Sequence, residues 1–236
     1  FGWVDSNPSR MTPLKDYLEN LESNTFFAES LLNLPAYCVH GSADDYVPVQ
    51  HSRLIVGRLR ELGYNVTYDE QPGAGHGSFG SGTTDKVYTW LLAQRRTPVP
   101  KRVVYKTAWL RHSGAYWVKV DRFVEPLRFA VIEAEADDSN QVWVKTDNVR
   151  QFTLDLAAGL VDLTAPVTVI VDGVQQTVPR VPSSGRVSLE RRGSFENAEC
   201  GMRSAEWVRS ALSSDRAPTR SAGMDDSYEN GNPREG

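Results

Sequence analysis

The sequence predicts an α/β unit followed by an all-β domain. In the first 95 residues, helical stripes of apolar residues alternate with short apolar runs typical of strands. A basic segment punctuated by prolines, "RTPVPKR" (96–102), is typical of a linker. The runs that follow are short, rich in Val and aromatic residues, and separated by Gly, Asp and Asn. Such spacing is typical of a β-sandwich.

The elements of the α/β unit alternate along the chain. Thr12 is a suitable N-cap, Pro13 is a suitable first helical residue, and the helical pattern extends to residue 34. Further on, the pattern predicts strands over 36–40 and 65–70 and helices over 49–62 and 84–95. This order favours parallel strands joined by right-handed crossovers.

The strands of the all-β domain are predicted from residue 102 onwards. Asp172-Gly173 is a hairpin-turn dipeptide between "VTVIV" and "QQTV". The pattern then decays, and one helix, Ala205 to Leu212, is the last element we expect. The polar composition predicts disorder at the C-terminus. The runs that predict strands are "RVVYKTAWL", "AYWVKV", "LRFAVIEAEA", "QVWVKT", "FTLDLA" and "PVTVIVDG".

Composition excludes several classes of protein. The 236 residues carry a net charge of −4, so we expect no nucleic-acid partner. No apolar run approaches the length of a membrane span, about 18 residues. Cys38 and Cys200 lie far apart, which argues against a disulfide framework and a zinc site. We expect neither a metal nor a cofactor. The N-terminus has no Met and no signal-peptide pattern, which fits a chain that begins inside a longer protein or has been processed or trimmed.

Two polar loops follow the two predicted parallel strands. Asp44 lies in "YCVHGSADDYVPVQHS", and His76 lies in the glycine-rich segment "GAGHGSFGSG". Because parallel strands end at the same edge of a sheet, we expect these loops to converge. A carboxylate on one imidazole nitrogen fixes the tautomer and leaves the other nitrogen to take a proton from a nucleophile. The alternative is a surface loop with an incidental histidine.

These motifs resemble the C-terminal part of an α/β-hydrolase, most closely the prolyl oligopeptidase family. That family carries H-G-x-x-D-x-x-V-P around its triad acid, matched here by residues 40–48, and a G-H-G-like loop, matched by Gly75-His76-Gly77. The match covers roughly residues 1–95. The resemblance implies that Asp44 is the triad acid and His76 the base, with His40 structural and Asp45 a solvated neighbour.

The nucleophile of this family is missing from the sequence. Its serine lies in a G-x-S-x-G elbow, and no such pentapeptide exists in the chain. Ser78 and Ser81 lie in the histidine loop, which cannot also be the elbow. In this family the order is Ser, then acid, then His, so we expect the serine upstream of Phe1. The missing N-terminal part of the hydrolase domain is then a required partner.

The resulting fold class is α/β followed by all-β. We expect the C-terminal portion of an α/β-hydrolase sheet over 1–97, a smaller β-sandwich-like accessory domain over 103–182, and an irregular or disordered tail over 183–236. The expected function is a C-terminal fragment of a serine hydrolase of the peptidase type, acting on a peptide or ester substrate and inactive alone. The alternatives are a carboxylesterase or polyester depolymerase, and a non-catalytic β-sandwich binding module. A secreted or periplasmic location is favoured over a cytoplasmic one.

Other polar and aromatic residues carry weaker signals. His51 is expected at the surface of a helix and His112 in a turn between strands. The acidic stretch "EADD" (135–138) is more typical of a solvated turn than of a cation site. Four aromatic residues of the β-domain could line a carbohydrate or polymer surface, but such residues more often form the core. They are Trp109, Tyr116, Trp117 and Trp143.

Overall fold

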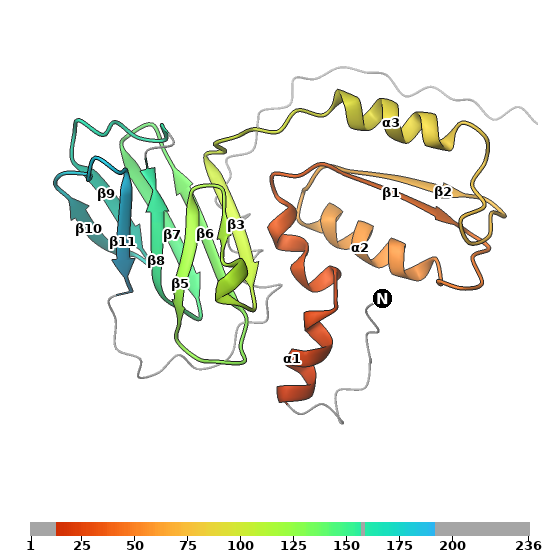
Figure 1. The fold of residues 1–236 in the computed structure, drawn as a ribbon, viewed down its shortest axis with the longest axis horizontal. Helices are drawn as coiled ribbons and strands as arrows, with labels where there is room; N and C mark the ends of the chain where they lie inside the picture. The colour runs from red at the N-terminus through yellow and green to blue at the C-terminus, as the bar shows by residue number, and fades with distance from the viewer. Residues whose placement is uncertain (1–12, 157–158, 192–236) are drawn as a thin grey trace, which may run out of the picture. The chain divides into compact units, whose positions relative to one another are not determined.

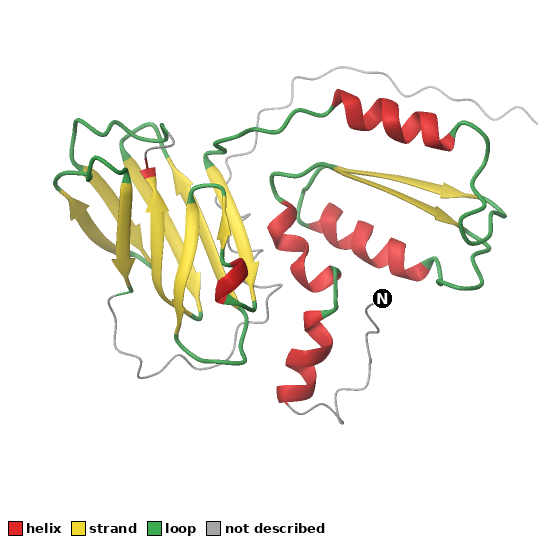
Figure 2. Ribbon diagram, in the orientation of Figure 1, coloured by secondary structure: helices red, strands yellow, loops and turns green. Residues whose placement is uncertain are grey.

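The computed structural model describes residues 13–156 and 159–191 (Figure 1). Residues 13–95, here called the α/β unit, hold a two-stranded parallel sheet with helices around it. Figures 1 and 2 show α2 and α3 on opposite faces of this sheet. Its elements are α1 (Pro13–Leu21), the 3-10 helix η2 (Thr25–Leu31), β1 (Ala36–Gly41), α2 (Gln50–Glu61), β2 (Val66–Gln71) and α3 (Thr83–Ala93).

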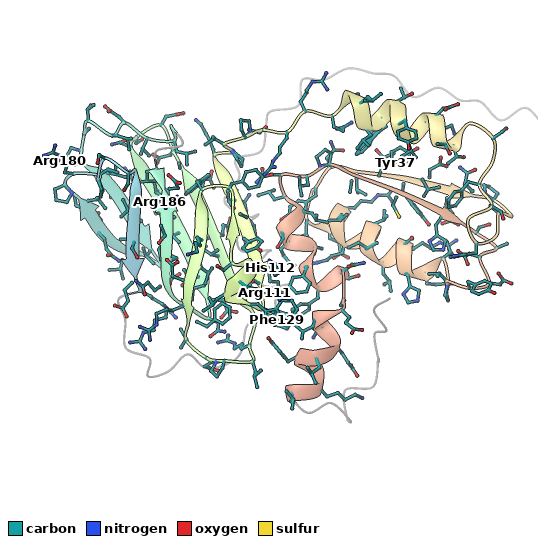
Figure 3. The ribbon with its side chains drawn as sticks, viewed as in Figure 1. Tyr37, Arg111, His112, Phe129, Arg180 and Arg186 are labelled. Atoms are coloured by element: carbon teal, nitrogen blue, oxygen red, sulfur yellow. The ribbon has the colours of Figure 1, made fainter. Side chains whose placement is uncertain are left out.

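Local sequence explains where these helices lie. In α2, Val56 and Leu59 are buried, and the helix ends before Gly63, whose φ of +72° suits glycine. A second left-handed glycine, Gly82, precedes α3. The rings of Tyr37 on β1 and Trp90 on α3 meet edge to face at 5.2 Å between centroids, which holds α3 against the sheet. Figure 3 labels Tyr37.

The β-sandwich, residues 102–156 and 159–190, consists of two sheets. One has five strands in the order β10-β9-β7-β6-β3, in which β7 and β9 run parallel and the other pairs antiparallel. The other has four antiparallel strands in the order β11-β8-β5-β4. The elements are β3 (Arg102–Thr107), η3 (Leu110–His112), β4 (Gly114–Ala115), β5 (Val118–Phe123), β6 (Ala130–Ala136), β7 (Gln141–Asp147), β8 (Val149–Asp155), β9 (Val167–Val171), β10 (Val174–Val178) and β11 (Arg186–Glu190).

The inner faces of both sheets form one core. Ile132 and Val169 from the five-stranded sheet join Phe152 and Leu154 from the four-stranded sheet, and all four are fully buried. In β7 and β11, residues alternate between this core and the outer face. The predicted hairpin turn at Asp172-Gly173 is confirmed, since both residues have positive φ and the flanking valines pair.

The fold class predicted from the sequence is wrong. Most strands belong to the β-sandwich, and the parallel sheet of the described residues has only the two strands β1 and β2. These two strands and short helices do not make an α/β-hydrolase sheet. The physical reason is the supply of strands: residues 13–95 contain two segments that pair as strands, whereas residues 102–190 pair extensively.

The sandwich also extends past the boundary expected at residue 182. "RVSLE", here β11, pairs in register with β8 and buries Val187 and Leu189. The linker is tied to the sandwich, because the Trp117 indole N–H donates to the Pro100 carbonyl at 2.7 Å. The helix expected at 205–212 and most of the expected tail lie outside the described residues.

Polar contacts join the first helices to β3. The Tyr17 hydroxyl donates to the Ala108 carbonyl at 3.3 Å, and the Asn33 amide donates to the Arg102 carbonyl at 2.8 Å. Beside them Lys106 is 95% buried, with its Nζ 3.9 Å from Glu29 Oε2 and 3.3 Å from the centre of the Phe26 ring. Burial lowers the pKa of Lys106 to about 8, against the raising effect of Glu29.

Candidate functional site

The parallel pairing of β1 and β2 brings two loops to one edge of the sheet. His40 lies opposite Glu70 and Gly41 opposite Gln71, so the strands end level with each other. The segment after β1 carries Asp44, and the segment after β2 carries His76. This is the edge at which α/β sheets generally bind ligands.

Gly41 allows the two loops to touch. A Cβ at this position would lie 2.2 Å from the Ala74 carbonyl oxygen, closer than any side chain permits. The Ala43 N–H donates to that same oxygen at 3.0 Å, and the Gly73 N–H donates to the Ser42 hydroxyl oxygen at 2.8 Å. The loops are therefore fixed to each other by two hydrogen bonds, at a separation that only glycine at residue 41 accommodates.

Asp44 and His76 meet across these loops. The His76 Nδ1 atom lies 3.0 Å from Asp44 Oδ2. The Asp44 side chain is only 6% exposed, whereas the His76 side chain is 55% exposed. The pair thus has a covered carboxylate and an imidazole that reaches solvent. Because the carboxylate accepts at Nδ1, the Nε2 atom of His76 is left as the basic nitrogen.

The environment of Asp44 favours its ionised form. The Val47 N–H donates to Oδ1 at 2.8 Å and is the largest influence holding the pKa of Asp44 below its usual range. The hydrogen bond from His76 and the Tyr46 N–H at 3.0 Å also lower this pKa, and burial opposes them. Asp44 is therefore a charged acceptor at neutral pH.

An aromatic side chain borders the imidazole. The rings of Tyr46 and His76 lie 5.4 Å apart at an interplanar angle of 38°, and Tyr46 is 81% exposed. Sequence reasoning missed Tyr46; its place two residues after Asp44 is the only signal for it in the sequence. The arrangement puts an exposed aromatic ring beside the His76 imidazole.

No nucleophile faces His76 within residues 13–156 and 159–191. The Ser78 hydroxyl lies 3.5 Å from the His76 carbonyl oxygen, and among the described residues the hydrogen-bond partner of the His76 ring is Asp44. The described part of the chain thus brings a carboxylate and an imidazole together without a serine hydroxyl on the ring.

Glu70, near the end of β2, is a second charged group at this edge of the sheet. Arg53 of α2 donates to both carboxylate oxygens of Glu70, and the Tyr68 hydroxyl donates to it at 2.8 Å. Arg53 and Tyr68 lower the pKa of Glu70 to about 2. Glu70 is therefore a fixed anion whose charge is already paired, and it helps hold α2 on β2.

The other sequence candidates lie elsewhere. Asp45 is exposed, and His112 lies in η3 of the sandwich (Figure 3). Asp137 of the acidic stretch accepts from the N–H groups of Ser139 and Gln141, which makes it a turn residue. Among the described residues, no group of three or more His, Cys, Asp or Glu side chains could hold a metal ion.

The four aromatic candidates divide into two kinds. Trp117 is 98% buried in the core, and Tyr116 packs against the core from its rim. Trp109 and Trp143 are 44% and 49% exposed. The exposed pair comes from different places in the chain, since Trp109 precedes η3 and Trp143 lies in β7.

A fungal protein is similar to part of this chain. No family model matches the chain, and no solved structure matches it. A curated relative, an "Uncharacterized secreted protein" of Arthroderma benhamiae, is 32% identical over 158 residues. The match covers 64% of this chain and 17% of the relative, so the chain spans less than a fifth of that protein. Every helix in the described residues is too short or too polar to cross a lipid bilayer.

Proposed function

We propose that this chain supplies the acid and the base of a serine hydrolase, with Asp44 as the orienting carboxylate and His76 as the general base. The observation that carries the proposal is the 3.0 Å contact between His76 Nδ1 and Asp44 Oδ2. The covered carboxylate and the exposed imidazole suit their two tasks, since the acid must stay in place and the base must reach substrate.

The reaction would be acyl transfer to water. The Nε2 atom of His76 takes the proton of a serine hydroxyl as the serine oxygen attacks an amide or ester carbonyl. The same proton then passes to the leaving amine or alcohol. His76 then deprotonates a water molecule as it attacks the acyl carbon, and the proton passes to the serine oxygen as its ester bond breaks and the carboxylic acid leaves. Asp44 stabilises the imidazolium in both steps and keeps Nε2 turned toward the reacting atoms.

The nucleophile would come from protein sequence outside these 236 residues. Two observations support this. The sequence contains no G-x-S-x-G elbow, and no hydroxyl group of the described residues is hydrogen-bonded to the His76 ring. The resemblance to the prolyl oligopeptidase family makes a peptidase the first choice and a carboxylesterase or polyester depolymerase the second, and the motifs themselves suit amide and ester substrates equally. The name of the fungal relative favours a secreted location.

Labelling with a fluorophosphonate probe tests the proposal, because the probe reacts with a serine only when a base activates it. We expect the full-length product of the encoding gene to label and the isolated 236-residue chain to remain unlabelled. In the full-length protein, His76→Ala and Asp44→Asn should reduce the labelling rate by at least about 100-fold, in line with the loss of a general base. His112→Ala and Asp45→Asn are the matched controls and should label at the original rate.

Two results would overturn the proposal. One is a full-length product that does not label under conditions in which it is folded. The other is labelling that survives His76→Ala at the original rate, because the serine would then depend on a different base.

A further inference from the structure

His40 is a buried histidine with a polar partner on each ring nitrogen. It lies at the end of β1 with 9% of its surface exposed. Its Nδ1 is 2.6 Å from the Ser52 hydroxyl, and its Nε2 is 2.9 Å from the Val47 carbonyl oxygen. Nε2 also lies 3.4 Å from Asp44 Oδ2, the oxygen that His76 contacts.

These partners fix the tautomer of the neutral ring. A carbonyl oxygen only accepts hydrogen bonds, so the ring proton must sit on Nε2 and point at Val47. Nδ1 is then an acceptor, and the Ser52 hydroxyl donates to it. In this state both nitrogens are satisfied inside the protein, as a buried imidazole requires.

Val47 links His40 to the candidate site. Its carbonyl accepts from His40, and its N–H donates to Asp44 Oδ1 at 2.8 Å. The turn from Asp44 to Val47 is therefore held in place by hydrogen bonds at both the carbonyl oxygen and the N–H of Val47. If the imidazole no longer donated to the carbonyl, Val47 could move, and the carboxylate that its N–H holds would move with it.

We propose that His40 is a positioning residue, which presents the Asp44 carboxylate to His76 through the Val47 carbonyl. This rests on the proposed function, in which the contact between Asp44 and His76 is the working part. A histidine that only filled space at the end of β1 would affect stability and leave that contact as it is.

A pair of amide substitutions separates these two roles. The Gln amide nitrogen can reach the position of Nε2, so His40→Gln keeps a donor for Val47. The shorter Asn reaches only the position of Nδ1, so His40→Asn keeps a partner for Ser52 and loses the donor to Val47. The probe is the low-field ¹H NMR resonance of the His76 Nδ1–H, recorded on the 236-residue chain and assigned by its loss in Asp44→Asn.

We expect His40→Gln to retain this resonance and His40→Asn to lose it. The pKa of the Asp44 carboxyl, followed by ¹³C NMR, should stay low in His40→Gln and rise in His40→Asn, since the Val47 N–H is its main determinant. Ser52→Ala and His112→Leu are controls that should keep the resonance. Folded His40→Gln and His40→Asn proteins with the same resonance and the same Asp44 titration would overturn the proposal.

A measurement on the unaltered chain keeps the proposal testable if the variants do not fold. The ¹⁵N shifts of His40 should show a proton on Nε2, and an Nδ1-protonated ring would overturn the proposal. None of these spectra depends on the nucleophilic serine of the proposed hydrolase. If full-length protein fails to label while the Gln and Asn variants differ as expected, His40 still positions Asp44 and only the hydrolase function is lost.

Discussion

The β-sandwich and the α/β unit bury their strands to different degrees. In the sandwich, Ile132 and Phe152 are fully buried, whereas every residue of β2 is partly exposed. Large apolar side chains of α3 are also open to solvent, with Leu91 55% and Leu92 75% exposed. The sandwich has its own core, but the unit that carries Asp44 and His76 covers its sheet only partly. The site geometry therefore depends on local hydrogen bonds and one glycine contact more than on a packed core.

The largest expected difference between the two regions concerns core truncation. Phe152→Ala removes a fully buried ring from the sandwich and should lower the free energy of unfolding by about 3–5 kcal/mol. Leu92→Ala, in the α/β unit, removes a side chain that is mostly in water and should change it by less than about 0.5 kcal/mol. Urea denaturation followed by circular dichroism measures both. Similar losses in the two variants would mean that α3 is covered in solution.

The second prediction concerns Lys106, which joins the regions. The pKa of Lys106 is about 8 in the folded chain, against an ordinary value of 10.5 that applies to the unfolded chain. At pH values between these two, the unfolded chain therefore binds more protons than the folded chain. The free energy of unfolding should therefore rise from pH 8 to pH 10, by roughly 2–3 kcal/mol. Above pH 10 it should fall. Tyr64 and Tyr68 have folded pKa values raised to about 12, and their stabilising contribution is lost as the pH climbs through that range.

Two lysine variants test whether Lys106 causes this rise in the free energy of unfolding. Lys106→Met should abolish the rise between pH 8 and pH 10, because the titrating group is gone. Lys119→Met is the control: Lys119 is a 61% exposed lysine of β5, and its loss should leave the rise intact. Denaturation curves recorded across this pH range give the answer, and a rise that persists in Lys106→Met would assign it to another group.

The third prediction concerns the glycine contact at the site. Gly41→Ala places a methyl group against the Ala74 carbonyl, so the loops must separate, at a cost of about 1–3 kcal/mol. The low-field Nδ1–H resonance of His76 should disappear from the ¹H NMR spectrum at the same time. Gly57→Ala is the matched control, because nothing lies within 4 Å of its Cβ position in the middle of α2. That change should stabilise the chain by about 0.5–1 kcal/mol.

Much of the local structure could be predicted from the sequence. Strands β3 and β5 to β9 and the turn at Asp172-Gly173 follow from short-range alternation and turn chemistry, and the structure has them, whereas β11 lies in a segment that was expected to be irregular. Other features depend on distant residues. Tyr116 has a φ of 55° and breaks the alternation just before β5, so the neighbouring residues Trp117 and Val118 are both buried in the core. The fold class failed because local motifs do not determine how many strands a sheet contains.

The candidate site shows the same limit. The contact between Asp44 and His76 could be predicted, because it needs only two parallel strands that end level with each other. The partners of His40 could not, since Ser52 and Val47 reach its ring through side-chain and backbone orientations that no spacing rule specifies. Backbone topology is predictable from pattern, whereas the hydrogen bonds that tune a carboxylate depend on the folded turn.

The smallest expected effect concerns acid stability of the α/β unit. The hydrogen bonds from Val47, His76 and Tyr46 lower the folded pKa of Asp44. A lowered folded pKa stabilises the chain above the unfolded value, about 3.9, and this contribution is lost as the pH falls through the folded value. Asp44→Asn should therefore flatten the decline of the melting temperature in acid, and the neighbouring exposed Asp45→Asn should not. Melting curves between about pH 5 and pH 2 would contradict the assignment if both variants kept the slope of the original chain.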